Sequence, residues 1–124
     1  MYKIYFYKDK KGKEPVAEYI RSLCSKNDKN SRINANKIND YVEMLSRFGT
    51  AAGEPFVKHI CDNLWELRPL RNRIFFVAWT GDSYVLLHHF IKKTRKTPQR
   101  EIDKALREIE SLNEGDNYEQ SNWK

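Results

Sequence analysis

Two arginines, Arg68 and Arg73, stand five positions apart on either side of the short stretch 69–72. If that stretch closes a hairpin in simple register, the two residues lie opposite each other and point to the same face of the sheet. Adjacent guanidinium groups repel each other unless an anion or an acid balances them, and Glu66 is the nearest acidic residue. Arginine also presents a planar fork of donors that matches phosphate oxygens. The pair is therefore either a phosphate clamp or a solvated rim that pairs with Glu66.

A second basic cluster follows at 88–98, with the sequence HHFIKKTRKTP. Because side chains alternate along a strand, His89, Ile91 and Lys93 share one side and the set that includes Phe90 shares the other. Only one of the two sets can face a ligand groove. An aromatic ring beside cations, with two arginines on the neighbouring strand, suits RNA, since stacking and phosphate contacts then combine.

Basic residues are concentrated in one part of the chain. The whole sequence carries a formal charge of +6, and the segment 56–100 holds nine basic residues against three acidic ones. Such clustering indicates a polyanion-binding surface with nucleic acid as the leading partner, although a merely soluble basic face is the alternative. The residues that we expect to contact RNA are Lys58, Arg71, Phe76, Phe90, Lys92, Arg95 and Lys96.

The apolar pattern predicts one domain over residues 1–112. Residues 2–7 favour a first strand, and apolar residues at helical spacing after Pro15 and after Ser31, the expected N-cap, predict a helical hairpin. The second helix should end at Gly49. The residues expected on its buried side are Ile33, Ile38, Tyr41, Val42, Leu45 and Phe48.

Residues 49–55 are interpreted as a loop, and the apolar and aromatic runs 64–68, 73–79 and 84–91 predict an antiparallel meander. A third helix follows Thr97 and Pro98, which suit a cap and a first-turn proline. Its apolar side should hold Ile102, Ala105, Leu106, Ile109 and Leu112. The fold class is α+β in the order β-α-α-β-β-β-α, with helices on one face of a twisted sheet and the other face free for a ligand. The polar tail 113–124 should be loosely ordered.

Neither a metal nor another cofactor is expected. His59, Cys61, His88 and His89 show no metal-ligand spacing. Cys24 and Cys61 lie 37 positions apart without a CxxC motif, so we interpret both as small apolar fillers. Lysines interrupt the N-terminal apolar run and no stretch approaches the length of a membrane span, which favours a cytoplasmic protein without membrane contact.

The segment LWELRPLRNRIFFVAWTGDSYVLLHHFIKKTRKTP resembles the phage-derived branch of the HigB/RelE toxin superfamily. Three landmarks carry the resemblance: LWELR with Arg73 five positions further on, an aromatic hairpin strand, and HFIKKT followed by KTP. Together with the helices upstream and downstream, it covers residues 1–112 and implies a RelE-like fold.

This resemblance implies the toxin of a type II toxin–antitoxin system, a ribosome-dependent messenger RNA endonuclease that inhibits translation and growth without a metal. In such enzymes the 2′-hydroxyl attacks the adjacent phosphorus and leaves a 2′,3′-cyclic phosphate and a free 5′-hydroxyl. Arg73 matches the position that stabilises transition-state charge, with Arg68 in support. Lys93 matches a basic position near the leaving oxygen, and Lys92 is its neighbour.

The sequence departs from the RelE branch in ways that leave the general base open. Leu64 and Glu66 stand where that branch carries lysines, and its tyrosine in the last segment has no counterpart before Tyr118. His89, His88 and Glu66 are candidate bases, because imidazole titrates near neutrality and a carboxylate accepts a proton. Charge stabilisation and distortion of the substrate by the ribosome would be the alternative to a dedicated base.

The resemblance also implies partners: a small helix-turn-helix antitoxin of the HigA kind, in a complex expected to be a heterotetramer, and the ribosome with its message. The antitoxin would either cover the basic groove or grip the helical hairpin. The competing function is a non-catalytic nucleic-acid-binding or partner-binding module of the same fold. Such a module would bind RNA with salt-sensitive affinity and leave translated messages intact.

Overall fold

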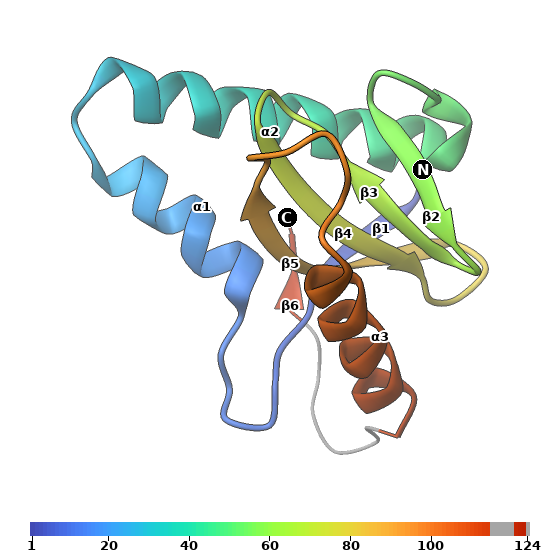
Figure 1. The fold of residues 1–124 in the computed structure, drawn as a ribbon. Helices are drawn as coiled ribbons and strands as arrows, with labels where there is room; N and C mark the ends of the chain where they lie inside the picture. Colours follow the sequence, from blue (N-terminus) through green and yellow to red (C-terminus); the bar gives the residue numbers. More distant parts are fainter. Residues whose placement is uncertain (115–120, 124) are drawn as a thin grey trace.

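The computed structural model describes residues 1–114 and 121–123. Its elements are β1 (Lys3–Phe6), α1 (Pro15–Ser25), α2 (Lys29–Phe48), the 3₁₀ helix η1 (Gly49–Ala52), β2 (Val57–Cys61), β3 (Leu64–Leu67), β4 (Asn72–Ala78), β5 (Ser83–Ile91), α3 (Gln99–Glu114) and β6 (Ser121–Asn122). The strands form one sheet in the order β2-β3-β4-β5-β1-β6 (Figure 1). In it β1 pairs with β5 in parallel, and the other described pairs are antiparallel. The expected α+β class and element order are confirmed, while β2 and β6 were not predicted.

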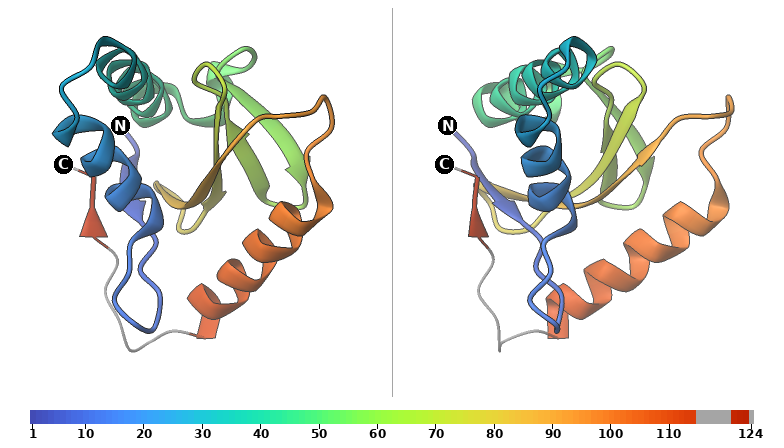
Figure 2. Two further views of the ribbon diagram at one scale, coloured as in Figure 1. Left: turned by 60° about the vertical axis from the view of Figure 1, so that its left-hand side comes forward. Right: turned by 90° about the vertical axis from the view of Figure 1, so that its left-hand side faces the viewer.

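Helices cover both faces of the sheet (Figure 2). On one face α1 and α2 pack against Ile74 and Phe76 of β4, and on the other face Ala105 and Leu112 of α3 pack with Phe75. Neighbouring residues of β4 thus enter different apolar clusters, as the alternation of a strand requires. The prediction that one whole face stays free for a ligand is therefore wrong, because the apolar side of α3 occupies it.

Helix α2 begins earlier than its sequence suggests. Asp28, not Ser31, is the N-cap, and its carboxylate accepts hydrogen bonds from the backbone N–H and the hydroxyl of Ser31 at 2.9 Å and 2.8 Å. Aspartate caps as well as serine does, so the cap that lies closer to the α1–α2 turn takes the position. The predicted stop at Gly49 is confirmed, with φ of 61° at that residue.

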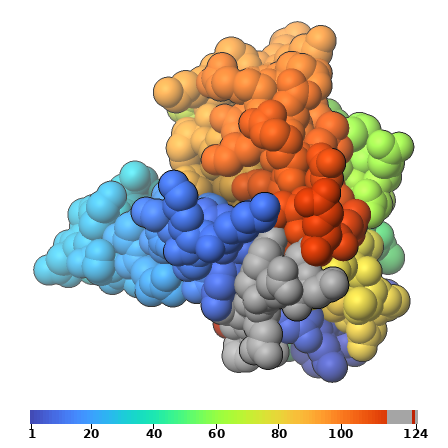
Figure 3. All heavy atoms as spheres, turned by 90° about the horizontal axis from the view of Figure 1, so that it is seen from below, coloured from blue at the N-terminus to red at the C-terminus, as the bar shows by residue number. Residues whose placement is uncertain are grey.

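Several residues assigned to buried helix sides are exposed. These are Ile33, Phe48 and Leu106, whose exposed fractions are 44%, 53% and 40%, together with Cys24. The α1–α2 junction projects from the body of the molecule (Figure 3), so Cys24 at the end of α1 and Ile33 near the start of α2 lie beyond the sheet that the helices cover. Cys24 is therefore not a buried filler, whereas Cys61 is partly buried beside the α3 cluster.

None of the helices in the described ranges has the length and apolar character needed to cross a membrane.

Strand β5 contains a β-bulge opposite Phe75. Ile74 pairs with His89, but Phe76 pairs with Leu86, so two β5 residues stand opposite Phe75. A bulge of this kind shifts the alternation of side chains by one position. It therefore decides which of the two sets of side chains at the end of β5 faces the basic cluster.

The tail that we expected to be loosely ordered is only partly described. Its first two residues complete α3, and residues 115–120 and 124 lie outside the described residues. Residues 121–122 form β6 on the outer side of β1. The backbone N–H of Trp123 donates to the carbonyl of Ile4 at 2.8 Å, and its ring packs against the α1–α2 cluster.

Candidate functional site

The two arginines converge on one carboxylate. Strands β3 and β4 pair Leu67 with Ile74, and in this register Arg68 and Arg73 directly follow as the next opposed positions. Oε1 of Glu66 lies 3.5 Å from Nε of Arg68 and 3.8 Å from Nε of Arg73. The hairpin register expected from the sequence is confirmed. The solvated-rim alternative does not describe it, because the side chains of Glu66 and Arg73 are only 2% and 8% exposed.

Glu66 is held from two sides. One oxygen faces the arginines, and the other accepts a hydrogen bond of 3.3 Å from the hydroxyl of Thr97. Burial raises the pKa of Glu66, although the positive charges of Arg73 and Arg68 act in the opposite direction. Lys58 pairs with Glu66 across β2 and β3 and adds a third nearby cation. The carboxylate thus fixes the positions of the cations around it.

Arg73 is locked to the turn that precedes it. Its Nη1 donates to the carbonyl oxygens of Leu70 and Asn72, both at 2.8 Å. Burial and the neighbouring Arg68 lower the pKa of Arg73, but a guanidinium remains protonated at neutral pH. The site therefore presents a permanent cation in a fixed orientation, which is the arrangement that stabilises charge developing in a transition state.

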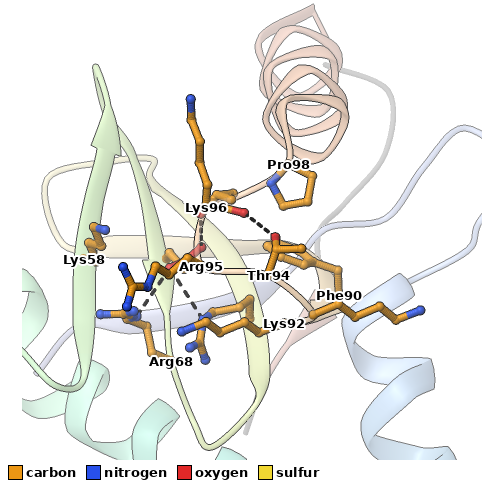
Figure 4. A pocket seen from close by; sticks show the side chains of 12 residues that line it. Lys58, Arg68, Phe90, Lys92, Thr94, Arg95, Lys96 and Pro98 are labelled. Atoms are coloured by element: carbon orange, nitrogen blue, oxygen red, sulfur yellow. Dashed lines mark hydrogen bonds and ion pairs between the residues drawn. The ribbon is translucent and has the colours of Figure 1, made fainter.

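A narrow cavity lies beside the arginines, between the sheet and the segment 92–98 that leads to α3. It is lined by seven cationic side chains and one carboxylate, Lys58, Arg68, Arg73, Lys92, Lys93, Arg95, Lys96 and Glu66, together with Phe90, Thr94, Thr97 and Pro98. Figure 4 shows Lys58 on β2, Arg68 after β3, and Lys92 and Arg95 on the segment 92–98, gathered around it. The excess of positive charge in this lining favours a polyanion.

The cavity is tight inside and opens into wider hollows. Its volume is about 20 Å³, which is room for about one water. An adjoining hollow of about 380 Å³ shares Arg73, Lys92 and Lys93 with it. A second hollow, of about 350 Å³, shares Phe90 and Lys93. A phosphate group is larger than the narrow cavity, so it would lie in the adjoining hollow that Arg73 also lines, with a longer chain across the mouth.

Most of the residues expected to contact RNA lie around this cavity, but Phe76 does not. Lys58, Phe90, Lys92, Arg95 and Lys96 line it. Arg71 lines the adjoining hollow, where its Nη2 donates to the carbonyl of Lys92 at 3.0 Å. The ring of Phe76 is fully buried in the α1–α2 core, because its position on β4 points away from the cavity. A role for Phe76 at an RNA surface is therefore excluded.

Neither histidine of β5 lines the cavity. After the bulge, His89 faces α1, where its ring stacks on Tyr19 with centroids 3.7 Å apart. Burial lowers the pKa of His89 to about 4, so the ring is neutral at physiological pH. His88 is buried on the α3 side, with Nδ1 2.5 Å from Glu108 and Nε2 3.0 Å from Glu101. Of the three candidate bases, only Glu66 reaches the cavity.

Three lining residues were not singled out as site residues from the sequence. Thr94, Thr97 and Pro98 belong to the KTRKTP run, in which only the cations had drawn attention. Thr97 was expected to cap α3, but its hydroxyl donates to Glu66. Its position in the chain could have identified Thr97 as a site residue, because the segment that joins β5 to α3 passes over the cavity.

Within residues 1–114 and 121–123, no three His, Cys, Asp or Glu side chains lie close enough together to form a metal site.

Comparison with known proteins identifies one matching family. The model of the phage-derived Gp49-like protein family matches residues 26–110, which include α2, the β2–β5 strands and most of α3. No match was found among curated proteins. The matched segment spans well over half of the chain and contains every residue that lines the narrow cavity. The chain therefore belongs to the family of phage-derived Gp49-like proteins.

Proposed function

We propose that this protein is the toxin of a type II toxin–antitoxin system, a ribosome-dependent endonuclease that cleaves messenger RNA without a metal. The observation that carries the proposal is the convergence of Arg68 and Arg73 on the buried carboxylate of Glu66 beside a cavity lined by cations. The resemblance of residues 64–98 to HigB/RelE toxins supports the same function.

The reaction is an internal transesterification of RNA. The 2′-oxygen attacks the adjacent phosphorus in line, the bond from phosphorus to the 5′-oxygen breaks, and the products are a 2′,3′-cyclic phosphate and a 5′-hydroxyl. The 2′-hydroxyl loses one proton and the leaving oxygen gains one, so no water is consumed. The enzyme must align the attack and stabilise a pentacoordinate phosphorus that carries extra negative charge.

Arg73 stabilises that charge, because its guanidinium is fixed by two backbone carbonyls and lines the cavity. Arg68 supplies a second planar donor from the opposite strand. Lys93 acts near the leaving oxygen, with Lys92 beside it, since both line the narrow cavity and its wider neighbour. Lys58, Arg95, Lys96 and Arg71 contact flanking phosphates, and Phe90 stacks on a base.

Glu66 is the candidate proton acceptor. It lines the cavity, and burial raises the pKa of its carboxyl toward the range in which a base works near neutrality. The cleavage rate should then increase as the pH rises through the pKa of Glu66, because only the ionised carboxyl accepts the proton. Glu66→Gln should be slow at every pH and should lack this acidic limb in a single-turnover rate profile. If Glu66→Gln kept the same rise of cleavage rate with pH as the wild-type protein, Glu66 would not be the proton acceptor.

The proposed partners are the ribosome with its message and a HigA-like helix-turn-helix antitoxin, in a heterotetrameric complex in the cytoplasm. Mixing the purified toxin with a candidate antitoxin from a neighbouring reading frame should abolish cleavage. Light scattering should then give a mass of two copies of each chain. A complex of any other stoichiometry would correct the heterotetramer without affecting the chemistry.

The proposed activity is tested with purified protein, ribosomes and a defined message. Wild-type protein should cut the message only when ribosomes are present, and the fragments should carry a 2′,3′-cyclic phosphate and a 5′-hydroxyl. A message with a single 2′-deoxy nucleotide at the cut position should remain intact there. Fragments with a 3′-hydroxyl and a 5′-phosphate would contradict the mechanism, because hydrolysis would then have occurred.

A non-catalytic binding module is the second candidate, and it is favoured because no histidine is among the described residues that line the cavity. In the same assay this module would retain RNA by filter binding while the message stays whole. Binding without cleavage in the presence of ribosomes would therefore select this alternative.

A further inference from the structure

A chain of side-chain hydrogen bonds ties the turn before Arg73 to the helical hairpin. The hydroxyl of Tyr19 on α1 donates to Oδ1 of Asn72 at 2.5 Å, and Nδ2 of Asn72 donates to Oδ1 of Asn34 on α2 at 2.8 Å. Nδ2 of Asn34 in turn donates to the carbonyl of Asn30 at 2.8 Å. Asn72 is only 1% exposed, so its amide depends on these protein partners.

The same amide closes the turn that holds the arginine. Both the backbone N–H and Nδ2 of Asn72 donate to the carbonyl of Pro69 at 3.0 Å. The turn places Leu70 at a φ of 60°, a conformation that non-glycine residues rarely adopt without surrounding constraints. The carbonyls of Leu70 and Asn72 are the two acceptors of Nη1 of Arg73. A displaced Asn72 amide would therefore displace the guanidinium.

The Tyr19 end of this series of hydrogen bonds is also held in place. The ring of Tyr19 stacks on His89 with an interplanar angle of 7°, so its hydroxyl points to Asn72 from a fixed position. On the other side of the turn, the backbone N–H of Lys92 donates to the carbonyl of Arg71 at 2.8 Å. The turn is thus clamped between the helices and the cationic segment 92–98.

We propose that Tyr19, Asn34 and Asn72 are positioning residues for Arg73, and that the helical hairpin is in this way a working part of the catalytic site. None of the three contacts the reacting atoms. Their hydrogen bonds fix the orientation of the arginine and so determine the rate of cleavage, not the affinity for RNA. This inference rests on the proposed endonuclease activity.

Two small substitutions test it. Tyr19→Phe removes one hydroxyl and keeps the ring on His89, and Asn34→Ala removes the acceptor of the Asn72 amide. Each should slow single-turnover cleavage of a ribosome-bound message by about tenfold, because small misplacements of a catalytic group are costly. The affinity for a 2′-O-methyl RNA should be unchanged. Ser22→Ala is the matched control, since it removes an exposed hydroxyl of α1 that donates to the backbone carbonyl of Tyr19 and leaves the Tyr19 side chain unchanged. Wild-type rates in both folded variants would overturn the proposal.

A double-mutant cycle separates positioning from general stability. If Tyr19 acts through Arg73, then Tyr19→Phe should have little further effect on the residual cleavage of an Arg73→Lys variant. Additive losses in the double variant would show that Tyr19 acts independently of the arginine, and the proposal would fail.

A measurement without RNA keeps the inference distinct from the proposed function. In nitrogen-15 NMR spectra of the full chain, Tyr19→Phe and Asn34→Ala should shift or broaden the Nε–H signal of Arg73, and Ser22→Ala should not. If wild-type protein cuts no message but these shifts occur, the proposed function fails and the positioning role stands. An Arg73 signal that is identical in all variants overturns the positioning role whatever the cleavage assay shows.

Discussion

Arg73 and Glu66 bring opposite charges into a part of the molecule that water hardly reaches. Such a pair costs desolvation energy that its mutual attraction offsets only when the remaining donors and acceptors are also satisfied. Here two turn carbonyls hold Arg73 and the hydroxyl of Thr97 holds Glu66. The ion pair between Arg73 and Glu66 therefore contributes little net stability to the fold. Its benefit is that the guanidinium already has the orientation needed to stabilise negative charge that develops nearby.

His89 should make the protein less stable in mild acid. Burial, to which the charges of His88 and Lys104 add, lowers its pKa to about 4 from the ordinary 6.5, and its buried Nδ1 has no hydrogen-bond partner among the described residues. The unfolded chain therefore binds the proton at a higher pH than the folded chain, so the free energy of unfolding falls as the pH drops from 6.5 toward 4.

The variant His89→Phe tests this, because it keeps an aromatic ring against Tyr19 without a titrating group. Its melting temperature relative to wild type should rise as the pH is lowered through that window. Melting curves that shift in parallel for the two proteins would contradict the neutral, buried state of His89.

The sequence predicted the arginine pair but not the positions of the histidines, for a physical reason. Opposed residues in a hairpin follow from counting the turn, so Arg68, Arg73 and their acid Glu66 could be placed. His88 and His89 lie at and just beyond a bulge, which one sequence does not reveal because it depends on packing against both faces.

At the scale of elements, α2 ends where the chain must turn sharply against the sheet. Gly49 has a φ of 61°, and a Cβ atom there would lie 2.7 Å from the hydroxyl of Tyr84 and 2.8 Å from the ring of Tyr2. Gly49→Ala should therefore lower the free energy of unfolding by about 2 kcal/mol, through strain and overpacking together. Urea denaturation measures it, with Gly81→Ala as the control because a Cβ there meets nothing within 4 Å. Equal stability of the two variants would contradict this account of the helix end.

The strands that the sequence did not predict, β2 and β6, have only weak strand patterns in their local sequence. In β2 the residues Lys58 and His59 are exposed, so this edge strand lacks the apolar alternation of β3, β4 and β5. Strand β6 is only two residues long. The apolar stripe of α3 identified a helix but carried no information on which face of the sheet it would cover, since that depends on the path of the segment 92–98.

On the scale of the whole molecule, the fold brings seven cationic side chains together at one cavity. The cations that line the cavity come from β2, from Arg68 just after β3, from β4 and from the segment 92–98, and these parts of the chain meet only in the fold (Figure 4). Their combined field should draw an RNA strand to the cavity before any specific contact forms.

RNA binding should accordingly weaken steeply with salt. Each phosphate neutralised on a single strand contributes about 0.7 to the slope of log affinity against log salt concentration. The double variant Lys92→Ala, Lys96→Ala should lower that slope by about 1.4 for a 2′-O-methyl RNA measured by fluorescence anisotropy. Lys10→Ala with Lys11→Ala, in the loop between β1 and α1, is the charge-matched control. An equal loss of slope in both double variants would show that net charge, not the cavity, binds the RNA.

We expect the fixed guanidinium of Arg73 to accelerate the cleavage of RNA, beyond any contribution to RNA binding. The most direct measurement is the single-turnover rate at which Arg73→Ala cuts a ribosome-bound message, beside Arg47→Ala, which removes an exposed arginine of α2 that pairs with Glu43. The rate should fall at least about 100-fold in Arg73→Ala, measured at a temperature at which circular dichroism shows the variant to be folded, because truncating a buried ion-pair partner also lowers stability. The rate should be unaffected in Arg47→Ala. A folded Arg73→Ala protein that cuts within about threefold of the wild-type rate, a difference of less than 1 kcal/mol in barrier, would contradict the account.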